Sequence, residues 1–147
     1  MTFNIPSPVR TEHQELHRTL EAITNLPGKT GEAAKTVARL LHPHFVKEEE
    51  FALPNLGLLP LLATDKVSSD MRAAVTFSDI LKKNLPEMLK EHQQIAGALQ
   101  ILNQAATEEN HPEVVNFTEK LMLHARTEED ILYPAAILIG EYLKMKL

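Results

Sequence analysis

Four histidines and two glutamates recur in this sequence at spacings that would let them bind metal together. Two of the histidines are each followed, four residues later, by a glutamate, and these His-x-x-x-Glu segments lie 80 positions apart. The other two stand in the triplet Glu-His-Gln, which is repeated 79 positions along the chain. Residues four apart on an α-helix share one face, so such a His and Glu can reach the same ion. The candidate metal ligands are His13, His44, Glu48, His92, His124 and Glu128.

Each of these histidines lies on the apolar stripe of a different predicted helix. Apolar residues recur three and four positions apart in four stretches, which is the spacing of amphipathic helices. The first two histidines are equally distant from the predicted turn at Pro27-Gly28, and the last two from the polar loop 107–112. Residues equidistant from a turn lie at one height in an antiparallel helix pair, so we expect all four in one layer. The stretches are residues 9–23, 34–51, 85–106 and 114–131.

The sequence therefore predicts an all-α fold, an up-down-up-down four-helix bundle with an internal two-fold pseudo-repeat. Its 147 residues, 44% of them hydrophobic, suit a single domain over residues 1–147. Residues 55–84 have no counterpart in the other half and form an extra helical insertion. Ser68 or Ser69 can cap a helix there that runs to Asn84 and either lengthens the third helix or forms a flap. The amphipathic tail after Ala135 is expected to extend the last helix over the core.

Composition excludes several other kinds of site. The absence of cysteine excludes disulfides, thiolate metal ligands and cysteine catalysis. A net charge of -5, with no basic run longer than Lys82-Lys83, argues against nucleic acid as a partner. We expect no signal peptide and no membrane span, because no apolar run approaches the roughly 20 residues that a span needs. The expected location is the cytoplasm.

Glu48 and Glu128 are the strongest indication of a metal, because both fall on apolar stripes. A carboxylate that faces a protein core costs several kcal/mol unless it is paired or metal-bound. No Lys or Arg stands on these stripes to pair with it. A metal-free layer of hydrogen-bonded His and Glu side chains is the alternative. The missing cationic partner favours the metal.

Three neighbouring residues are further candidates. His17 lies one turn after His13 on the flank of the stripe, and either supplies an extra ligand or edges the core. Glu49 and Glu129 follow the candidate ligands by one residue, which rotates them about 100° away on a helix. They are therefore better placed to orient a ligating imidazole than to bind metal directly. The one Glu-x-x-His motif ends at His111 in a loop, so the ferritin-like di-iron pattern is not met.

This order of motifs on four helices resembles the hemerythrin-like, or HHE, cation-binding domain. The resemblance covers roughly residues 8–140 apart from the insertion. It implies a four-helix bundle with two iron ions, bridged by two carboxylates and by an oxo or hydroxo group. Mn or Zn would suit the same imidazole and carboxylate ligands. Carried over to this chain, the ligands would be His13 and His44 for one iron, His92 and His124 for the other, and Glu48 and Glu128 as bridges.

The chain departs from the oxygen-carrying members of that family. These have a His-x-x-x-His pair on the third helix, whereas Met88 and Ala96 stand one turn either side of His92. They also tend to use Asp five residues after the last ligating His, where this chain has Glu129. Glu128 remains the expected ligand because it lies on the stripe. Fewer strong ligands leave open metal positions, which favour chemistry or exchange over reversible oxygen transport.

The sequence thus predicts a non-haem di-iron protein that binds or senses O2, NO or peroxide, or holds iron. The alternative is a di-iron oxidase, peroxidase or NO-processing enzyme that acts on a small oxidant in the coordination gap opposite His92. A metal-free helical interaction module is a third class, and the glutamates on the core stripes argue against it. The sequence indicates no partner beyond the small ligand, and it leaves the native metal and the oligomeric state open.

Overall fold

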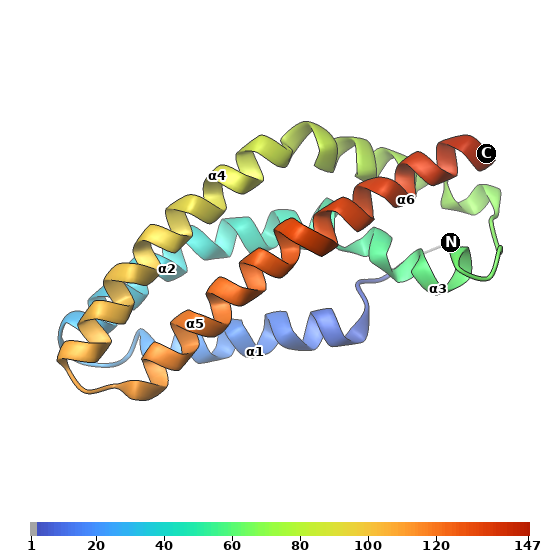
Figure 1. Cartoon of the computed structure of the whole chain (residues 1–147). Coiled ribbons are helices and arrows are strands. Elements are labelled where there is room, and N and C mark those ends of the chain that lie inside the picture. Colours follow the sequence, from blue (N-terminus) through green and yellow to red (C-terminus); the bar gives the residue numbers. More distant parts are fainter. Residues whose placement is uncertain (1–2) are drawn as a thin grey trace.

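The chain forms an up-down-up-down four-helix bundle, seen in the computed structural model, which describes residues 3–147 (Figure 1). Helices α1, α2, α4 and α5 each contact the next, and α5 contacts α1, so the four surround one interior. The described residues contain no strand, which confirms the predicted all-α fold. The elements are α1 (Ser7–Ile23), α2 (Gly28–Lys47), the π turn η1 (Glu48–Ala52), the 3-10 turn η2 (Pro54–Leu58), α3 (Leu59–Leu62), the 3-10 turn η3 (Ser69–Met71), α4 (Arg72–Glu108), α5 (Pro112–Thr127), the π turn η4 (Glu128–Leu132) and α6 (Tyr133–Lys146).

The insertion at residues 55–84 lengthens the third helix of the bundle. After η2, α3 and η3, the chain enters α4, which has 37 residues and continues without a break past Asn84. Of the two arrangements open from the sequence, the structure has the longer helix. Helix α6 packs against α4, and Ser78 Oγ donates a hydrogen bond of 2.8 Å to the carbonyl of Ile137. The expected extension of the last helix over the core is confirmed, since Ile139 and Leu143 of α6 are buried.

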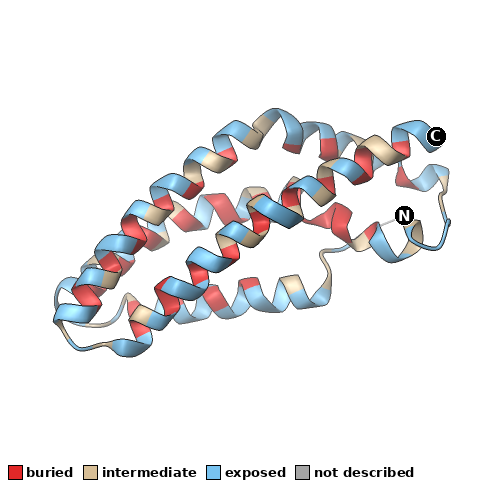
Figure 2. Ribbon diagram, viewed as in Figure 1, coloured by how far each residue is buried: buried red, intermediate tan, exposed pale blue. Residues whose placement is uncertain are grey.

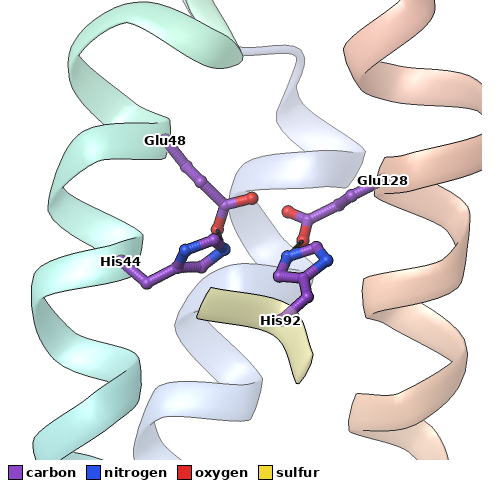
Figure 3. A group of neighbouring side chains, drawn as sticks. All are labelled: His44, Glu48, His92 and Glu128. Atoms are coloured by element: carbon purple, nitrogen blue, oxygen red, sulfur yellow. Dashed lines mark ion pairs between the residues drawn. The ribbon is translucent and has the colours of Figure 1, made fainter. Parts of the chain in front are cut away.

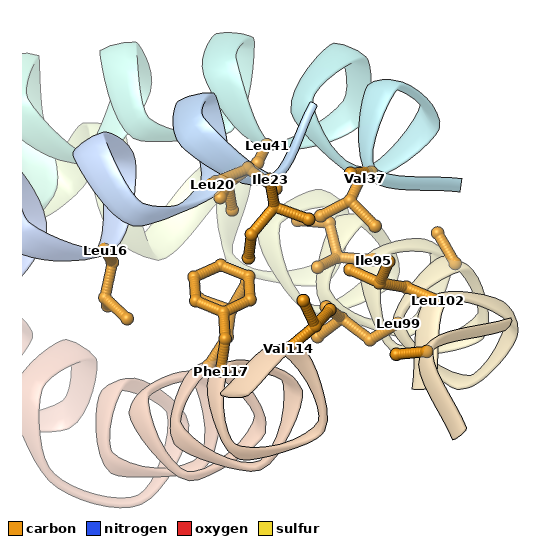
Figure 4. Close-up of a cluster of buried hydrophobic side chains, with 14 of the residues drawn as sticks. Leu16, Leu20, Ile23, Val37, Leu41, Ile95, Leu99, Leu102, Val114 and Phe117 are labelled. Atoms are coloured by element: carbon orange, nitrogen blue, oxygen red, sulfur yellow. The ribbon is translucent and has the colours of Figure 1, made fainter. Parts of the chain in front are cut away.

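The interior consists of two apolar clusters with a polar layer between them. One cluster fills the end where α1 joins α2 and α4 joins α5, and includes Leu20, Leu102 and Phe117 (Figure 4). The other lies among α4, α6 and the turns that follow α2, and includes Leu81 and Leu143. Buried positions run along the inner faces of the helices through both clusters (Figure 2). Each buried side chain of this size contributes about 1.5–3 kcal/mol to stability. The polar layer lies between the two apolar clusters, which stabilise the fold on either side of it.

Both helices that carry a His-x-x-x-Glu segment change to a π turn at the glutamate. In a π turn an N–H bonds to the carbonyl five residues earlier. Leu53 N–H donates to Glu48 O at 2.9 Å, and Tyr133 N–H donates to Glu128 O in the same way. Leu53 and Tyr133 are both 0% exposed. Five residues of α-helix would turn a side chain about 140° away, so the π turns bring these two residues onto the inner face.

The predicted stripes are therefore wrong beyond the two glutamates. Ile131, expected on the core stripe, is 60% exposed, and Phe51 is only partly buried. The i→i+5 pattern moves the inner face from the third to the fifth residue after each glutamate. Regular α-helix also ends just before each glutamate, inside the stretches 34–51 and 114–131 that the sequence predicts to be helical.

Glu109 joins the two loops at the far end of the bundle. Its carboxylate accepts hydrogen bonds from the backbone N–H groups of Lys29 at 3.1 Å and Thr30 at 2.8 Å, and from Thr30 Oγ1 at 2.5 Å. These N–H groups belong to the first turn of α2, where no intrahelical acceptor exists. The hydrogen bonds with Thr30 and Lys29 lower the pKa of Glu109. This contact ties the α1–α2 hairpin to the α4–α5 hairpin and fixes the relative heights of their side chains.

Replacement of Gly140 by alanine is expected to destabilise the bundle by about 1–3 kcal/mol, the usual effect of overpacking. A Cβ at Gly140 of α6 would overlap the Ser78 side chain of α4. Gly97→Ala is the matched control, because a Cβ there meets no other part of the described chain within 4 Å. Alanine at Gly97 should instead add roughly 0.5–1 kcal/mol of helix stability. Urea unfolding compares the variants, and a Gly140→Ala protein as stable as the wild type would contradict the close α4–α6 contact.

Candidate metal centre

Six histidine and glutamate side chains from all four bundle helices meet in the polar layer. All are buried, with at most 5% of each residue exposed. Within residues 3–147, their nitrogen and oxygen atoms form two groups that can hold a metal ion, each with its atoms within 4.8 Å of one another. Figure 3 shows the first group, in which the two glutamates approach each other from opposite helices. The groups are His44, Glu48, His92 and Glu128, and His13, His124 and Glu128.

The histidines pair differently from the expectation carried over from the family. That expectation joined the two histidines of each hairpin, His13 with His44 and His92 with His124. The structure instead groups His44 with His92, whose ring centroids are 4.6 Å apart, and His13 with His124, at 4.9 Å. Each group thus combines neighbouring helices of different hairpins, α2 with α4 and α5 with α1.

Glu128 belongs to both groups. Its Oε1 lies 3.2 Å from His92 Nε2. Its Oε2 lies 3.1 Å from His124 Nε2 and 3.4 Å from His13 Nε2. The two oxygens of one carboxylate thus face different histidine pairs, which is the arrangement that a bridging carboxylate requires.

Glu48 also faces both histidine pairs, and its contacts leave room for a cation. Its Oε1 lies 3.6 Å from His13 Nε2 and 3.6 Å from His44 Nε2. Within residues 3–147, Glu48 Oε1, His124 Nε2 and His13 Nδ1 are buried atoms without a hydrogen-bond partner. His124 Nε2 is close to Glu128, but the geometry is not that of a hydrogen bond. Unpartnered buried donors and acceptors are costly, and two of these atoms face the centre, so the residues fit a bound metal.

No Lys or Arg of the described chain forms an ion pair with the two glutamates. Among residues 3–147, the ion pairs of Glu48 and Glu128 within 4.0 Å involve only histidines. The alternative of a metal-free polar layer would leave Glu48 Oε1 unsatisfied, and this observation favours a metal.

On the outer side of the layer, the second ring nitrogen of each histidine faces another carboxylate. A carboxylate that accepts the Nδ1–H bond fixes the orientation of the ring and leaves the Nε2 lone pair directed at the centre. Three pairs are hydrogen-bonded, and the fourth is at ion-pair distance. They are His44–Glu91 at 2.8 Å, His92–Glu129 at 2.9 Å, His124–Glu12 at 2.5 Å and His13–Glu49 at 3.9 Å.

Two of these outer carboxylates were not predicted from the sequence. Glu129 and Glu49 contact imidazoles as expected of residues that follow a ligand by one position. Glu12 and Glu91 were visible as the first residue of each Glu-His-Gln triplet, but no role was assigned to them. A residue next to a histidine points about 100° away from it, so it reaches the histidine of the neighbouring helix rather than its own. Lys47 Nζ also contacts Glu91, at 2.5 Å.

Tyr133 is a further group at the centre, and the helical pattern of the sequence does not predict it. Its hydroxyl donates a hydrogen bond of 2.6 Å to Glu48 Oε2. The hydroxyl oxygen of Tyr133 also lies 3.3 Å from His44 Nε2 and 3.2 Å from His92 Nε2. The ring lies against that of His92, with centroids 5.6 Å apart. Only the π turn places Tyr133 here, because α-helical spacing directs it away from the layer.

The two central glutamates have opposite pKa shifts. Burial raises the pKa of Glu48 well above its usual range, and the nearby charge of Glu128 raises it further. Burial also opposes the ionisation of Glu128, but its contacts with Glu48 and three histidines outweigh that effect and hold its pKa well below the usual range. Without metal, Glu48 is therefore a neutral acid and Glu128 a carboxylate, so one negative charge is buried instead of two. Burial raises the pKa of Tyr133, and the negative charge of Glu128 raises it further, so the hydroxyl stays protonated.

The histidines balance the charge of Glu128. Burial lowers the pKa of His44. Burial acts in the same direction on His92 and His124, but their contacts with Glu128, and with Glu129 and Glu12 respectively, outweigh it and raise the pKa of both. The metal-free layer thus favours the protonated form of His92 and His124 beside its one carboxylate. A metal ion has to displace these protons, so its affinity should fall as the pH falls.

His17 is exposed and belongs to neither group. With His42 it lines a surface pocket of about 440 Å³, where the two rings lie 6.0 Å apart. The pocket reaches inward to His13 and to Phe45, whose rings stack with centroids 4.2 Å apart. It connects the His13 side of the layer with the surface, next to Glu49.

Residues 5–136 match the family described as the hemerythrin HHE cation binding domain. The match covers most of the chain, and the protein therefore belongs to this family. Comparisons with curated proteins and with solved structures give no match. The family and the geometry agree, because the family binds cations and the structure contains a buried cluster of His and Glu that fits a metal site. No helix among the described residues has the length and apolar character needed to cross a membrane.

Metal-free protein is expected to lose more stability from Glu128→Gln than from Glu48→Gln. Glu128 is ionised and contacts three histidines, so an amide there loses charge-assisted contacts worth about 1.5–3 kcal/mol. Glu48 is neutral, and glutamine resembles its protonated form in size and charge. Urea unfolding in the presence of a chelator at neutral pH measures both. Equal losses would contradict the opposite pKa shifts of the two glutamates.

Proposed function

We propose that the protein binds two iron ions in the polar layer and uses them to bind or sense a small oxidant or diatomic gas, O2, NO or peroxide, or to hold iron. The observation that carries this proposal is the carboxylate of Glu128, whose two oxygens face different histidine pairs. One carboxylate that touches two sets of nitrogen donors is best explained by two cations. Membership of the HHE family, rather than ligand chemistry, favours iron, since Mn and Zn suit the same donors.

Each ion would be held by one histidine pair. His44 and His92 would bind the first ion, His13 and His124 the second, and Glu128 would bridge them. Support comes from the Nε2 atoms, all of which lie within 3.6 Å of a central carboxylate oxygen. Two nitrogen donors for each ion are few, and such sites keep positions open for water or a small ligand.

The protein's own residues would control the centre in three ways. The outer carboxylates, Glu12, Glu91 and Glu129, orient the imidazoles by accepting their Nδ1–H bonds. Apolar side chains on both sides of the layer exclude bulk water. Glu48 holds a proton in the metal-free state and gives it up when a cation replaces it. When bound, two iron ions would supply the redox chemistry and the open positions at which O2, NO or peroxide binds.

The wild-type protein, loaded with ferrous iron, is expected to bind about two ions per chain, as in other two-metal sites. Glu48→Ala and His124→Ala should bind fewer, and the exposed Glu50→Ala should bind as many as the wild type. Metal should also raise the melting temperature of the wild type, by an amount equivalent to about 2.7 kcal/mol at a free concentration of 100 Kd. Elemental analysis and thermal unfolding measure these effects. If both layer variants keep the wild-type metal content and melting temperature, the site assignment is wrong.

The pocket that reaches His13 supports a second candidate function, a di-iron oxidase, peroxidase or NO-processing enzyme. A pocket of about 440 Å³ that ends at a candidate ligand offers a small oxidant a route to the layer. In this case the open metal positions would receive a substrate rather than a carried or sensed ligand.

The two functions differ in turnover. A binding or sensing protein, loaded with iron, should change its visible absorption when O2, NO or peroxide is added and should consume no more than about one equivalent per centre. An enzyme should consume many equivalents of peroxide or NO per chain when a reductant is supplied. Stopped-flow absorption and consumption assays distinguish them, with His124→Ala as the control for free iron. No absorption change with any of the three ligands would leave iron holding as the function.

A further inference from the structure

Tyr133 is an oxygen donor in the layer that has no equivalent in the other half of the chain. The residue 80 positions earlier is Leu53, which occupies the same place in its π turn: each donates its N–H to the carbonyl of the preceding central glutamate. Both side chains are 0% exposed. Five residues after Glu48 the buried side chain is therefore apolar, whereas five residues after Glu128 it carries a phenol.

The phenol oxygen lies among the donor atoms of one group only. It is 3.3 Å from His44 Nε2, 3.2 Å from His92 Nε2 and 2.6 Å from Glu48 Oε2. Three of the four residues of the first group thus surround a single buried oxygen. The second group, His13 with His124 and Glu128, has no tyrosine among the described residues that contact it.

We infer that Tyr133 supplies a phenolate oxygen to the metal ion held by His44 and His92, so that the two metal positions differ in kind. This inference rests on the proposed function. On binding, the phenolic O–H bond breaks, an oxygen–metal bond forms and the proton is released to solvent, with no change of oxidation state. The phenol then contributes one negative charge to the first position and none to the second.

This difference has a chemical consequence. An anionic oxygen donor stabilises a ferric ion more than a ferrous ion, because the electrostatic attraction grows with the charge of the metal. The first position should therefore hold ferric iron more strongly than the second. A tyrosine that only donated a hydrogen bond to Glu48 would leave the two positions alike in this respect.

Spectroscopy of the ferric protein tests the inference. A phenolate bound to ferric iron gives a visible charge-transfer band, and its ring vibrations are enhanced in resonance Raman spectra excited in that band. The chain has two tyrosines and no tryptophan. Wild type and Tyr142→Phe should show both signals at full intensity, and Tyr133→Phe should lose them. Tyr142 is the matched control because it is partly exposed on α6, where Lys146 lies 5.6 Å from its ring centroid.

The Tyr142→Phe protein carries the test even if Tyr133→Phe does not fold, because its one tyrosine is Tyr133. Phenolate vibrations in this variant that shift when ring-deuterated tyrosine is incorporated support the inference. Their absence from an iron-loaded Tyr142→Phe protein overturns it, as does their persistence in Tyr133→Phe. Iron content is measured on the same samples. A wild type that binds no iron refutes the proposed function and this inference together, whereas bound iron without phenolate signals refutes the inference alone.

Discussion

The burial of two carboxylates in one layer is the constraint on which the rest of the structure depends. Transfer of an ionised carboxylate into a protein interior costs several kcal/mol, which is a large share of the roughly 5–15 kcal/mol by which a domain of this size is stable. The metal-free protein reduces this cost by keeping Glu48 neutral and surrounding Glu128 with histidines. The two apolar clusters offset the remainder. Folding and cation binding are therefore coupled, because a cation removes a cost that the folded chain otherwise bears.

The orientation of the histidine rings in the layer is fixed by carboxylates that lie outside it. The outer carboxylates come from helices other than those of the histidines they contact: Glu12 of α1 reaches His124 of α5, and Glu91 of α4 reaches His44 of α2. Each contact therefore fixes a ring and joins two helices. Glu109 acts similarly at the far end by tying the two hairpins together. Cross-helix contacts at two levels fix the register of the donor atoms, which apolar packing alone does not fix because it has no directional preference.

Much of the fold and the candidate site follows from sequence because helical periodicity and turn chemistry are local. The spacing of His44 from Glu48 and their distance from the turn at Pro27-Gly28 predicted the burial of both residues in one layer. What the sequence did not predict depends on hydrogen bonding that periodicity does not encode. The π turns moved the inner face from Ile131 to Tyr133, and no pattern of apolar residues indicates an i→i+5 bond. The choice of partner helices, which pairs His44 with His92, depends on how the two hairpins pack, and spacing within one hairpin carries no information about it.

Several contacts of the layer recur in both halves of the chain, which makes the difference between Leu53 and Tyr133 informative. Corresponding residues make corresponding contacts: His44 and His124 each face a Glu-His-Gln glutamate, and each central glutamate begins a π turn. The internal repeat itself stays a prediction from spacing. A leucine in place of Tyr133 would fill the buried site as Leu53 does in the other half, without the desolvation cost of a phenol hydroxyl. Apolar packing therefore does not require a phenol. What the hydroxyl adds is an oxygen atom beside His44, His92 and Glu48. The desolvation cost of the hydroxyl is offset when its oxygen has a partner. That partner is the Glu48 carboxyl group without metal, and a cation once metal is bound.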